Sequence, residues 1–551
     1  MPESAPDESP RSVSLHRVRS LGVLLVFFGC ATVVWLSSTT PGGFVDLFET
    51  GAWLGPGSDM LAGKIPYRET FPIHGFLSDG GMDYFVWSAL GDRLSLSLHF
   101  RHLLEVFLNP TLFLLTSIAT GSPLLASLTI PLNVGFSTAV MFDRPVIPLL
   151  SLATFLWAIG ERPHRRRAFL AGLLGGIGFL YALDLGTFVL AAEILTLAVA
   201  GILLKDDPTR STASSLFLGL AIVVAPFLVG LLLLGALGAF VKVSFWELPR
   251  NVHAVWGLHF PAPWEVLSKW LKGEKYMIGP IPVGPAIGKR FYLSPVFGLL
   301  GIALALLGLR RREHRISALR LLATALACLF FFRHVIARFH LAAGNALAAP
   351  VFAACVALLH RLRKTRLTIR RARIERSGWA LVLIAVAIGM NGPKRTLDIV
   401  RGALAYTERA KSKENLTRLT ANRRGDVLVQ VDQAAEVQAL LRFSESRAHR
   451  AGPILDLTNR PALYFLLGRV NPTRFYQAPI MAPFQDEVIR DLERSPPAFV
   501  LLTSGTWLDA IDGRPNADRI PAVWRFVERA YPVRLRVGNT EVALQASEEF
   551  R

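Results

Sequence analysis

The residues best suited to chemistry lie in one stretch, 44–85, which reads FVDLFETGAWLGPGSDMLAGKIPYRETFPIHGFLSDGGMDYF. Asp46 and Glu49 stand three residues apart near its start, and a helix would place both carboxylates on one face. One carboxylate could then accept a proton from an incoming hydroxyl group while the other orients a partner. Asp79 and Asp83 add two more acids at the end of the stretch.

Cationic side chains lie between these acids. Lys64 and Arg68 could neutralise a phosphate group, and His74 follows six residues after Arg68. The alternative is a solvated loop whose charges face water and whose glycines and prolines only make turns. Composition alone favours neither interpretation, because charge in a loop outside the membrane carries no burial cost.

A second aromatic and basic segment is Trp246–Trp264, which reads WELPRNVHAVWGLHFPAPW. His253, Trp256 and His259 are its candidate substrate-binding residues, because aromatic faces can stack against sugar rings. An interfacial aromatic belt is the competing interpretation, since Trp is enriched at both bilayer surfaces. The two histidines lack a third ligand at a spacing typical of a metal site.

Basic residues also cluster in FRHVIARFH, residues 332–340. Arg333, Arg338 and His340 would suit an anionic partner such as a lipid phosphate, and snorkelling at a helix end is the alternative. Two acids inside apolar stretches, Asp184 and Glu193, are functional candidates because intramembrane acids are costly. Asp184 could equally begin a turn.

The composition predicts that these residues are carried by a membrane protein. The 551 residues are 52% hydrophobic and only 18% charged, and the net charge of +19 collects in short runs between long apolar segments. No nucleic-acid-binding motif accompanies the basic runs, so nucleic acid is not an expected partner. The three cysteines lie in apolar stretches and imply no disulfide framework.

Eleven apolar stretches are candidate spans, two of them short. They cover residues 21–36, 105–121, 124–141, 145–160, 168–185, 187–204, 215–240, 294–309, 319–332, 342–359 and 378–391. Threaded alternately through a bilayer, they place every basic loop on the side of the N-terminus, as the positive-inside rule requires. The expected organisation has three parts: a cytoplasmic segment 1–19, a transmembrane domain 20–391 with outer loops 39–103 and 241–293, and an extracytoplasmic domain 392–551.

The segment after residue 391 has ordinary charge density and alternating strand and helix patterns. Residues 427–431, 454–457 and 499–503 are expected to be buried strands. Residues 433–443 and 485–492 have helical periodicity. These patterns predict a small α/β domain.

The predicted chain resembles the GT-C superfamily of glycosyltransferases in four features. These are its polytopic architecture, the acids near the start of a long first outer loop, the pattern LAGKIPYRE followed by His74-Gly75, and an outer C-terminal domain. The first loop is similar to that of polyprenyl-phosphate-sugar-dependent enzymes of the protein O-mannosyltransferase and aminoarabinose transferase kind. The resemblance implies a sugar donor on polyprenyl phosphate and an acidic base in the first outer loop. Glu49 and Asp46 are the candidate bases, with Asp79 in reserve. The adjacent Asp-Glu pair usual in the superfamily is not present.

The sequence therefore predicts a multi-pass glycosyltransferase of the inner (plasma) membrane that transfers a sugar to a glycan, lipid or protein acceptor at the outer face. No cofactor follows from the patterns, and a divalent metal ion is left open. The alternative is a multi-pass transporter or lipid-linked sugar flippase, in which Glu193 and Asp184 would carry coupling protons. A non-catalytic scaffold would explain the tail but not the crowded first loop.

Overall fold

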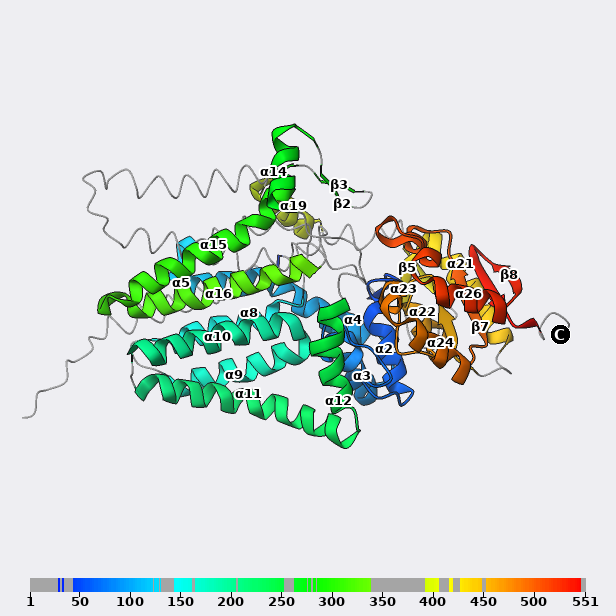
Figure 1. Cartoon of the computed structure of the whole chain (residues 1–551), viewed down its shortest axis with the longest axis horizontal. Helices are drawn as coiled ribbons and strands as arrows, with labels where there is room; N and C mark the ends of the chain where they lie inside the picture. The colour runs from blue at the N-terminus through cyan, green and yellow to red at the C-terminus, as the bar shows by residue number, and fades with distance from the viewer. Residues whose placement is uncertain are drawn as a thin grey trace, which may run out of the picture.

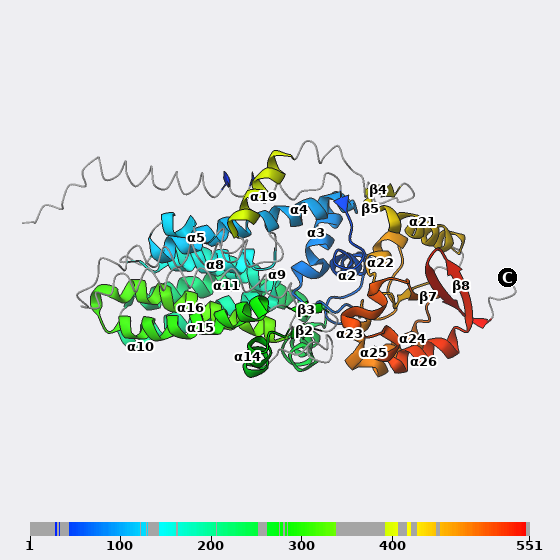
Figure 2. The same cartoon turned by 90° about the horizontal axis from the view of Figure 1, so that it is seen from above.

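The computed structural model describes residues 28–29, 32–33, 43–121, 123–127, 129, 143–160, 164–204, 207–251, 262–274, 276–278, 281–283, 285–337, 392–405, 416–419, 427–447 and 452–546. These residues form an elongated molecule (Figure 1). Long helices run together at one end, the strands of the C-terminal region lie at the other, and the helices of residues 43–93 lie between them. The view from above shows the same order (Figure 2).

Apolar sequence builds the helical bundle. Its helices are α4 (Leu94–Val106), α5 (Leu108–Thr120), α6 (Pro123–Ser127), α8 (Val146–Ala158), α9 (Arg165–Tyr181), α10 (Leu183–Leu204), α11 (Asp207–Leu233), α15 (Pro285–Leu309) and α16 (Arg315–Ala337). Four described stretches are long and apolar enough to cross a membrane, namely Leu96–Thr120, Leu183–Leu203, Ser211–Leu233 and Arg315–Arg333. The chain is a helical membrane protein, as its composition predicts, whereas the number of eleven spans stays a prediction.

Glycines bring α9 and α11 into close contact. A Cβ atom on Gly172 would lie 2.0 Å from the carbonyl oxygen of Leu216, and one on Gly219 would lie 2.2 Å from that of Phe169. Only small residues allow helix backbones to approach this closely. Elsewhere α11 leaves large apolar side chains such as Leu218 and Leu233 exposed, as expected of a surface that faces lipid.

Residues 43–93 pack as short helices against the end of the bundle. They comprise α2 (Gly51–Leu61), the π-helical turn η1 (Leu77–Gly81) and α3 (Met82–Leu90). Gly80 adopts a φ of +102°, and a Cβ there would lie 2.3 Å from the amide nitrogen of Gly57. Glycine at this position lets η1 lie directly on the backbone of α2.

The C-terminal region contains a mixed four-stranded sheet in the order β6-β7-β9-β8. Strands β6 (Ile454–Asp456) and β7 (Phe499–Thr503) are parallel, whereas β9 (Thr540–Leu544) is antiparallel to both β7 and β8 (Val533–Val537). Helices of this region are α21 (Val431–Ser446), α22 (Ala462–Leu467), α23 (Ala478–Met481), α24 (Gln485–Arg494), α25 (Asn516–Arg519) and α26 (Pro521–Ala530), with the 3₁₀ turns η4 (Ala482–Phe484) and η5 (Trp507–Gly513). Strands β6 and β7 and helices α21 and α24 cover most of the residues for which strands and helices were expected there.

A second sheet joins residues 43–44 to strands from residues 416–430. Strand β5 (Val427–Gln430) pairs in parallel with β1 (Gly43–Phe44) and antiparallel with β4 (Leu416–Leu419). The other described elements are α12 (Leu237–Lys242), η2 (Val243–Glu247), α14 (Pro263–Leu271), β2 (Tyr276–Ile278), β3 (Ile281–Val283), η3 (Arg312–His314) and α19 (Gly392–Leu404). Residues 43–93 are thus tied to the C-terminal region by backbone pairing as well as by packing.

Candidate functional site

Charged side chains gather where three bundle helices end. Helix α8 begins just after Asp143 and Arg144, α9 ends at Tyr181, and α10 begins at Leu183. The amide of Leu183 donates a hydrogen bond of 2.6 Å to the carbonyl oxygen of His74. This bond holds the segment before η1 on the helix ends. The group is called the bundle-end cluster below and consists of His74, Asp79, Asp83, Arg101, Asp143, Arg144, Tyr181 and Asp184.

Asp79 and His74 form the centre of the cluster. One oxygen of Asp79 accepts the amides of Ile73 at 2.5 Å and His74 at 2.7 Å, and the other lies 3.1 Å from Nδ1 of His74. The carboxylate is buried, whereas a third of the His74 side chain is exposed. A carboxylate only accepts, so Nδ1 donates, and a neutral ring then carries its lone pair on Nε2.

Electrostatics keep Asp79 ionised. Burial alone would raise its pKa, but the charge and hydrogen bonds of His74 and the charge of Arg144 lower it below the ordinary value. The neighbouring Tyr67 is affected in the opposite sense, since burial and the charge of Asp79 raise the pKa of its phenol. Asp79 is therefore a fixed anion beside a protonated tyrosine.

A second acid of the cluster is neutralised within the protein. Arg101 of α4 contacts Asp83 of α3 at 2.5 Å and also donates to the carbonyl oxygen of Ser78 at 2.8 Å. The guanidinium group lies over the ring of Trp53, 4.2 Å from its centroid. Both charges of this ion pair are buried, so the pair fixes α3 and η1 on the bundle.

Arg144 provides the cluster's second guanidinium group. It contacts Asp184 at 2.7 Å, and its neighbour Asp143 accepts a hydrogen bond from the hydroxyl group of Tyr181. Arg144 is 9% exposed, and among the described residues its Nε has no hydrogen-bond partner. Arg144 also acts through its charge on Asp79, which faces His74. A buried donor without a partner can accept an anionic ligand atom.

The structure separates the first-loop acids of the sequence analysis. Asp46 accepts the amides of Phe48 at 2.8 Å and Glu49 at 2.7 Å, while its own amide donates to Thr50 Oγ1 at 3.0 Å. Asp46 therefore caps the turn that leads into α2. The side chain of Glu49 is exposed at this turn. The turn packs on the C-terminal region, because the carbonyl oxygen of the adjacent Leu47 accepts the amide of Ala462.

The two candidate phosphate-binding cations of the loop have protein partners. Lys64 contacts Asp59 at 2.8 Å and donates to the carbonyl oxygens of Asn471 at 2.5 Å and Thr473 at 3.1 Å. Arg68 contacts Glu69 at 3.0 Å and remains partly exposed. Lys64 thus holds the C-terminal region, and the bundle-end cluster takes its cations from Arg101 and Arg144 instead.

Several other predicted site residues lie outside the described residues, namely His253, Trp256, His259, Arg338 and His340. Arg333 is described and is exposed near the end of α16. Within the described part of the chain, no group of three or more His, Cys, Asp or Glu side chains is placed to hold a metal ion.

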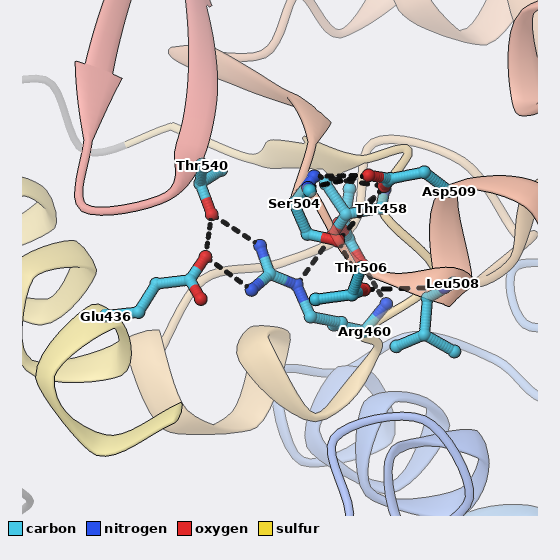
Figure 3. Close-up of polar contacts among 10 residues, drawn as sticks. Glu436, Thr458, Arg460, Ser504, Thr506, Leu508, Asp509 and Thr540 are labelled. Atoms are coloured by element: carbon cyan, nitrogen blue, oxygen red, sulfur yellow. Dashed lines mark hydrogen bonds and ion pairs between the residues drawn. The ribbon is translucent and has the colours of Figure 1, made fainter. Parts of the chain in front are cut away.

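Another polar group lies in the C-terminal region, after strand β6 (Figure 3). Arg460 is 2% exposed and donates to Thr458 at 2.8 Å, Glu436 at 2.7 Å and Thr540 at 2.7 Å. Asp456 accepts the amides of Thr458 and Arg460. This network joins α21 and β9 to the segment that follows β6.

Sequence patterns alone did not identify Arg101, Asp143 or Arg144 as candidate site residues. A signal for the last two was present: an Asp-Arg pair precedes a proline at the start of an apolar stretch. The expected topology places this pair outside, where the positive-inside rule disfavours arginine. Arg101 gave no such signal, since its pairing with Asp83 depends on the packing of α3 against α4.

Neither a scan against protein-family models nor a search of curated proteins gives a match for this chain.

Proposed function

We propose that the chain is a membrane glycosyltransferase that transfers a sugar from a polyprenyl-phosphate donor to an acceptor at the outer face of the membrane. The observation that carries the proposal is the meeting of His74 and Asp79 with Arg144 at one end of an apolar bundle. A base and an anion-binding group next to each other are what inverting sugar transfer from a lipid phosphate requires. The resemblance of the first loop to GT-C enzymes supports the same reaction.

In the proposed reaction, the oxygen of an acceptor hydroxyl group attacks the anomeric carbon of the sugar. The bond from that carbon to the phosphate oxygen breaks, and the polyprenyl phosphate leaves with the electron pair. The acceptor's proton goes to Nε2 of His74, whose ring Asp79 orients through Nδ1. Arg144 stabilises the charge of the departing phosphate. Glu49 remains the alternative base.

The test uses the purified full chain and a panel of synthetic polyprenyl-phosphate sugars, with membranes of the producing cells as acceptor. H74Q and D79N should reduce release of polyprenyl phosphate by about 10²- to 10⁴-fold, the range of general-base catalysis. R144A should weaken binding of the donor, measured with a photoreactive polyprenyl phosphate. E49Q should retain activity if His74 is the base.

Arg68 offers a matched control, because R68A removes a partly exposed cation of the same loop that lies outside the bundle-end cluster. R68A should keep near-normal transfer and donor binding. Full activity in both H74Q and D79N would remove the pair from the mechanism. Failure of the wild-type chain to bind or consume any donor of the panel would reject the glycosyltransferase proposal.

One observation favours the alternative of a transporter or lipid-linked sugar flippase, namely the buried acid Glu193 inside α10. A coupling acid must exchange its proton with both sides of the membrane. Replacing it by glutamine would then abolish proton-coupled movement of the substrate, whereas a transferase would tolerate the change.

A further inference from the structure

We infer that Glu193 is a proton-binding site in which the side chain is held as a neutral carboxylic acid that donates a hydrogen bond to Ser151. The inference concerns the interior of the bundle and is independent of the proposed glycosyltransferase reaction. It assigns the acid a fixed proton rather than an exchangeable one.

The count of hydrogen atoms around Ser151 carries the argument. Its Oγ lies 2.9 Å from the carbonyl oxygen of Ala171 on α9 and 2.9 Å from Oε1 of Glu193 on α10. A hydroxyl group has one hydrogen, and the carbonyl oxygen can only accept. If Ser151 donates to Ala171, a hydrogen bond between Ser151 and Glu193 requires the proton to come from Glu193.

The surroundings of Glu193 agree with a neutral acid. Both Ser151 and Glu193 are fully buried, and among the described residues Oε2 of Glu193 has no hydrogen-bond partner. An ionised carboxylate with one weakly polar neighbour would be very costly in such a place. Gly175 leaves space for the contact, because a Cβ there would lie 3.2 Å from Oγ of Ser151.

Within the described part of the helices packed around Glu193, no charged side chain forms an ion pair with the acid. Residues 146–158 of α8, 168–180 of α9 and 211–233 of α11 contain no ionisable side chain, and Glu193 is the only one in 185–204. On α16, Arg320 is directed to the carbonyl oxygens of Leu156, Ile159 and Ile118. Neutral Glu193 therefore links α10 through Ser151 to α8 and α9.

Infrared spectroscopy of the full chain in lipid tests the inference directly. The wild type should show the carbonyl stretching band of a protonated carboxyl group at neutral pH, and E193Q should lack it. S151A should shift the band, because it removes the hydrogen-bond acceptor of the acid. T196V is the matched control, since Thr196 is a buried hydroxyl residue of α10 that donates to the carbonyl oxygen of Ala192; it should leave the band unchanged.

Stability provides the second measurement. E193Q should keep the wild-type melting temperature, because its amide can donate to Ser151 in place of the acid, whereas E193A should lower it by several degrees. Absence of any band that distinguishes wild type from E193Q would overturn the inference, as would a band that S151A leaves unmoved. If E193Q fails to fold, the comparison of S151A with T196V still decides the question.

Discussion

Individual carboxylates near residues 43–93 differ in what neutralises them. Asp79 accepts hydrogen bonds from two backbone amides and faces His74. Buried Asp59 instead forms an ion pair with Lys64 and accepts a hydrogen bond of 2.9 Å from the hydroxyl group of Tyr476. Burial raises the pKa of Asp59, and the charge of Lys64 only partly offsets this. Asp46 accepts hydrogen bonds from two amides of its own turn. The number and type of hydrogen-bond donors around each acid thus determine its role.

We predict that Asp46 acts through capping. D46N should keep both stability and activity, because asparagine caps a helix start about as well as aspartate, whereas D46A should destabilise the chain by about 1 kcal/mol. Thermal unfolding and sugar transfer, measured on both variants, check this. Loss of transfer in D46N at unchanged stability would instead support Asp46 as the base.

We predict that Asp79 makes the fold sensitive to acid. Its pKa is lowered in the folded chain, so its contribution to stability is present above the ordinary aspartate range and is lost as pH falls through the lower folded pKa. Melting temperatures of wild type and D79N should therefore converge as the pH is lowered. Curves that stay parallel through this range would contradict the prediction.

At the level of elements, one arginine secures two helix ends. Arg320 of α16 donates to the carbonyl oxygens of Leu156 at 3.1 Å and Ile159 at 3.2 Å, at the end of α8, and of Ile118 at 3.1 Å, near the end of α5. Terminal carbonyl groups of a helix lack partners within it and carry partial negative charge. Arg320 thus donates hydrogen bonds to terminal carbonyl groups of both α5 and α8.

We predict that R320A destabilises the chain by about 2–4 kcal/mol, because several buried carbonyl groups lose a charged donor. R320K should recover only part of the loss, since an ammonium group lacks the planar fork. Thermal unfolding in lipid measures both effects. Arg333, exposed on the same helix, is the control, and an equal loss in R333A would argue against capping by Arg320.

Elements with strong local signals were predictable from the sequence, whereas side-chain pairings across elements were not. Strand β7 was expected over its observed residues because FVLLT is a continuous apolar run between polar segments. Asp79 and His74 were also candidates, since their residue types suit chemistry. Their coupling to Arg144 depends on contacts between distant segments, for which periodicity and composition carry no signal.

At the level of the whole molecule, residues 43–93 join the bundle to the C-terminal region. Arg474 contacts Glu487 at 2.7 Å and Glu247 of η2 at 3.3 Å, so it connects the C-terminal region to the end of the bundle. Lys64 makes the corresponding link from the loop through Asn471 and Thr473. Arg474 and Lys64 thus place charged contacts where the bundle, residues 43–93 and the C-terminal region meet.

We predict that Lys64 sets how firmly the C-terminal region is held. K64M should increase amide hydrogen exchange in residues 471–476, because the carbonyl oxygens of Asn471 and Thr473 lose their donor and Asp59 loses its cation. Exchange in α9 should stay unchanged. R68M serves as the control. If residues 471–476 were as well protected from exchange in K64M as in the wild type, Lys64 would not have this role.

The pairing of β1 with β5 has a consequence for biosynthesis. Gly43 and Phe44 leave the ribosome early, but their partners Val427 and Leu428 are made only after every bundle helix has been translated. The nascent chain must therefore keep this strand unpaired through most of translation. Residues 43–93 are thus among the first to be synthesised, yet their contacts with β5 and Asn471 can form only late in translation.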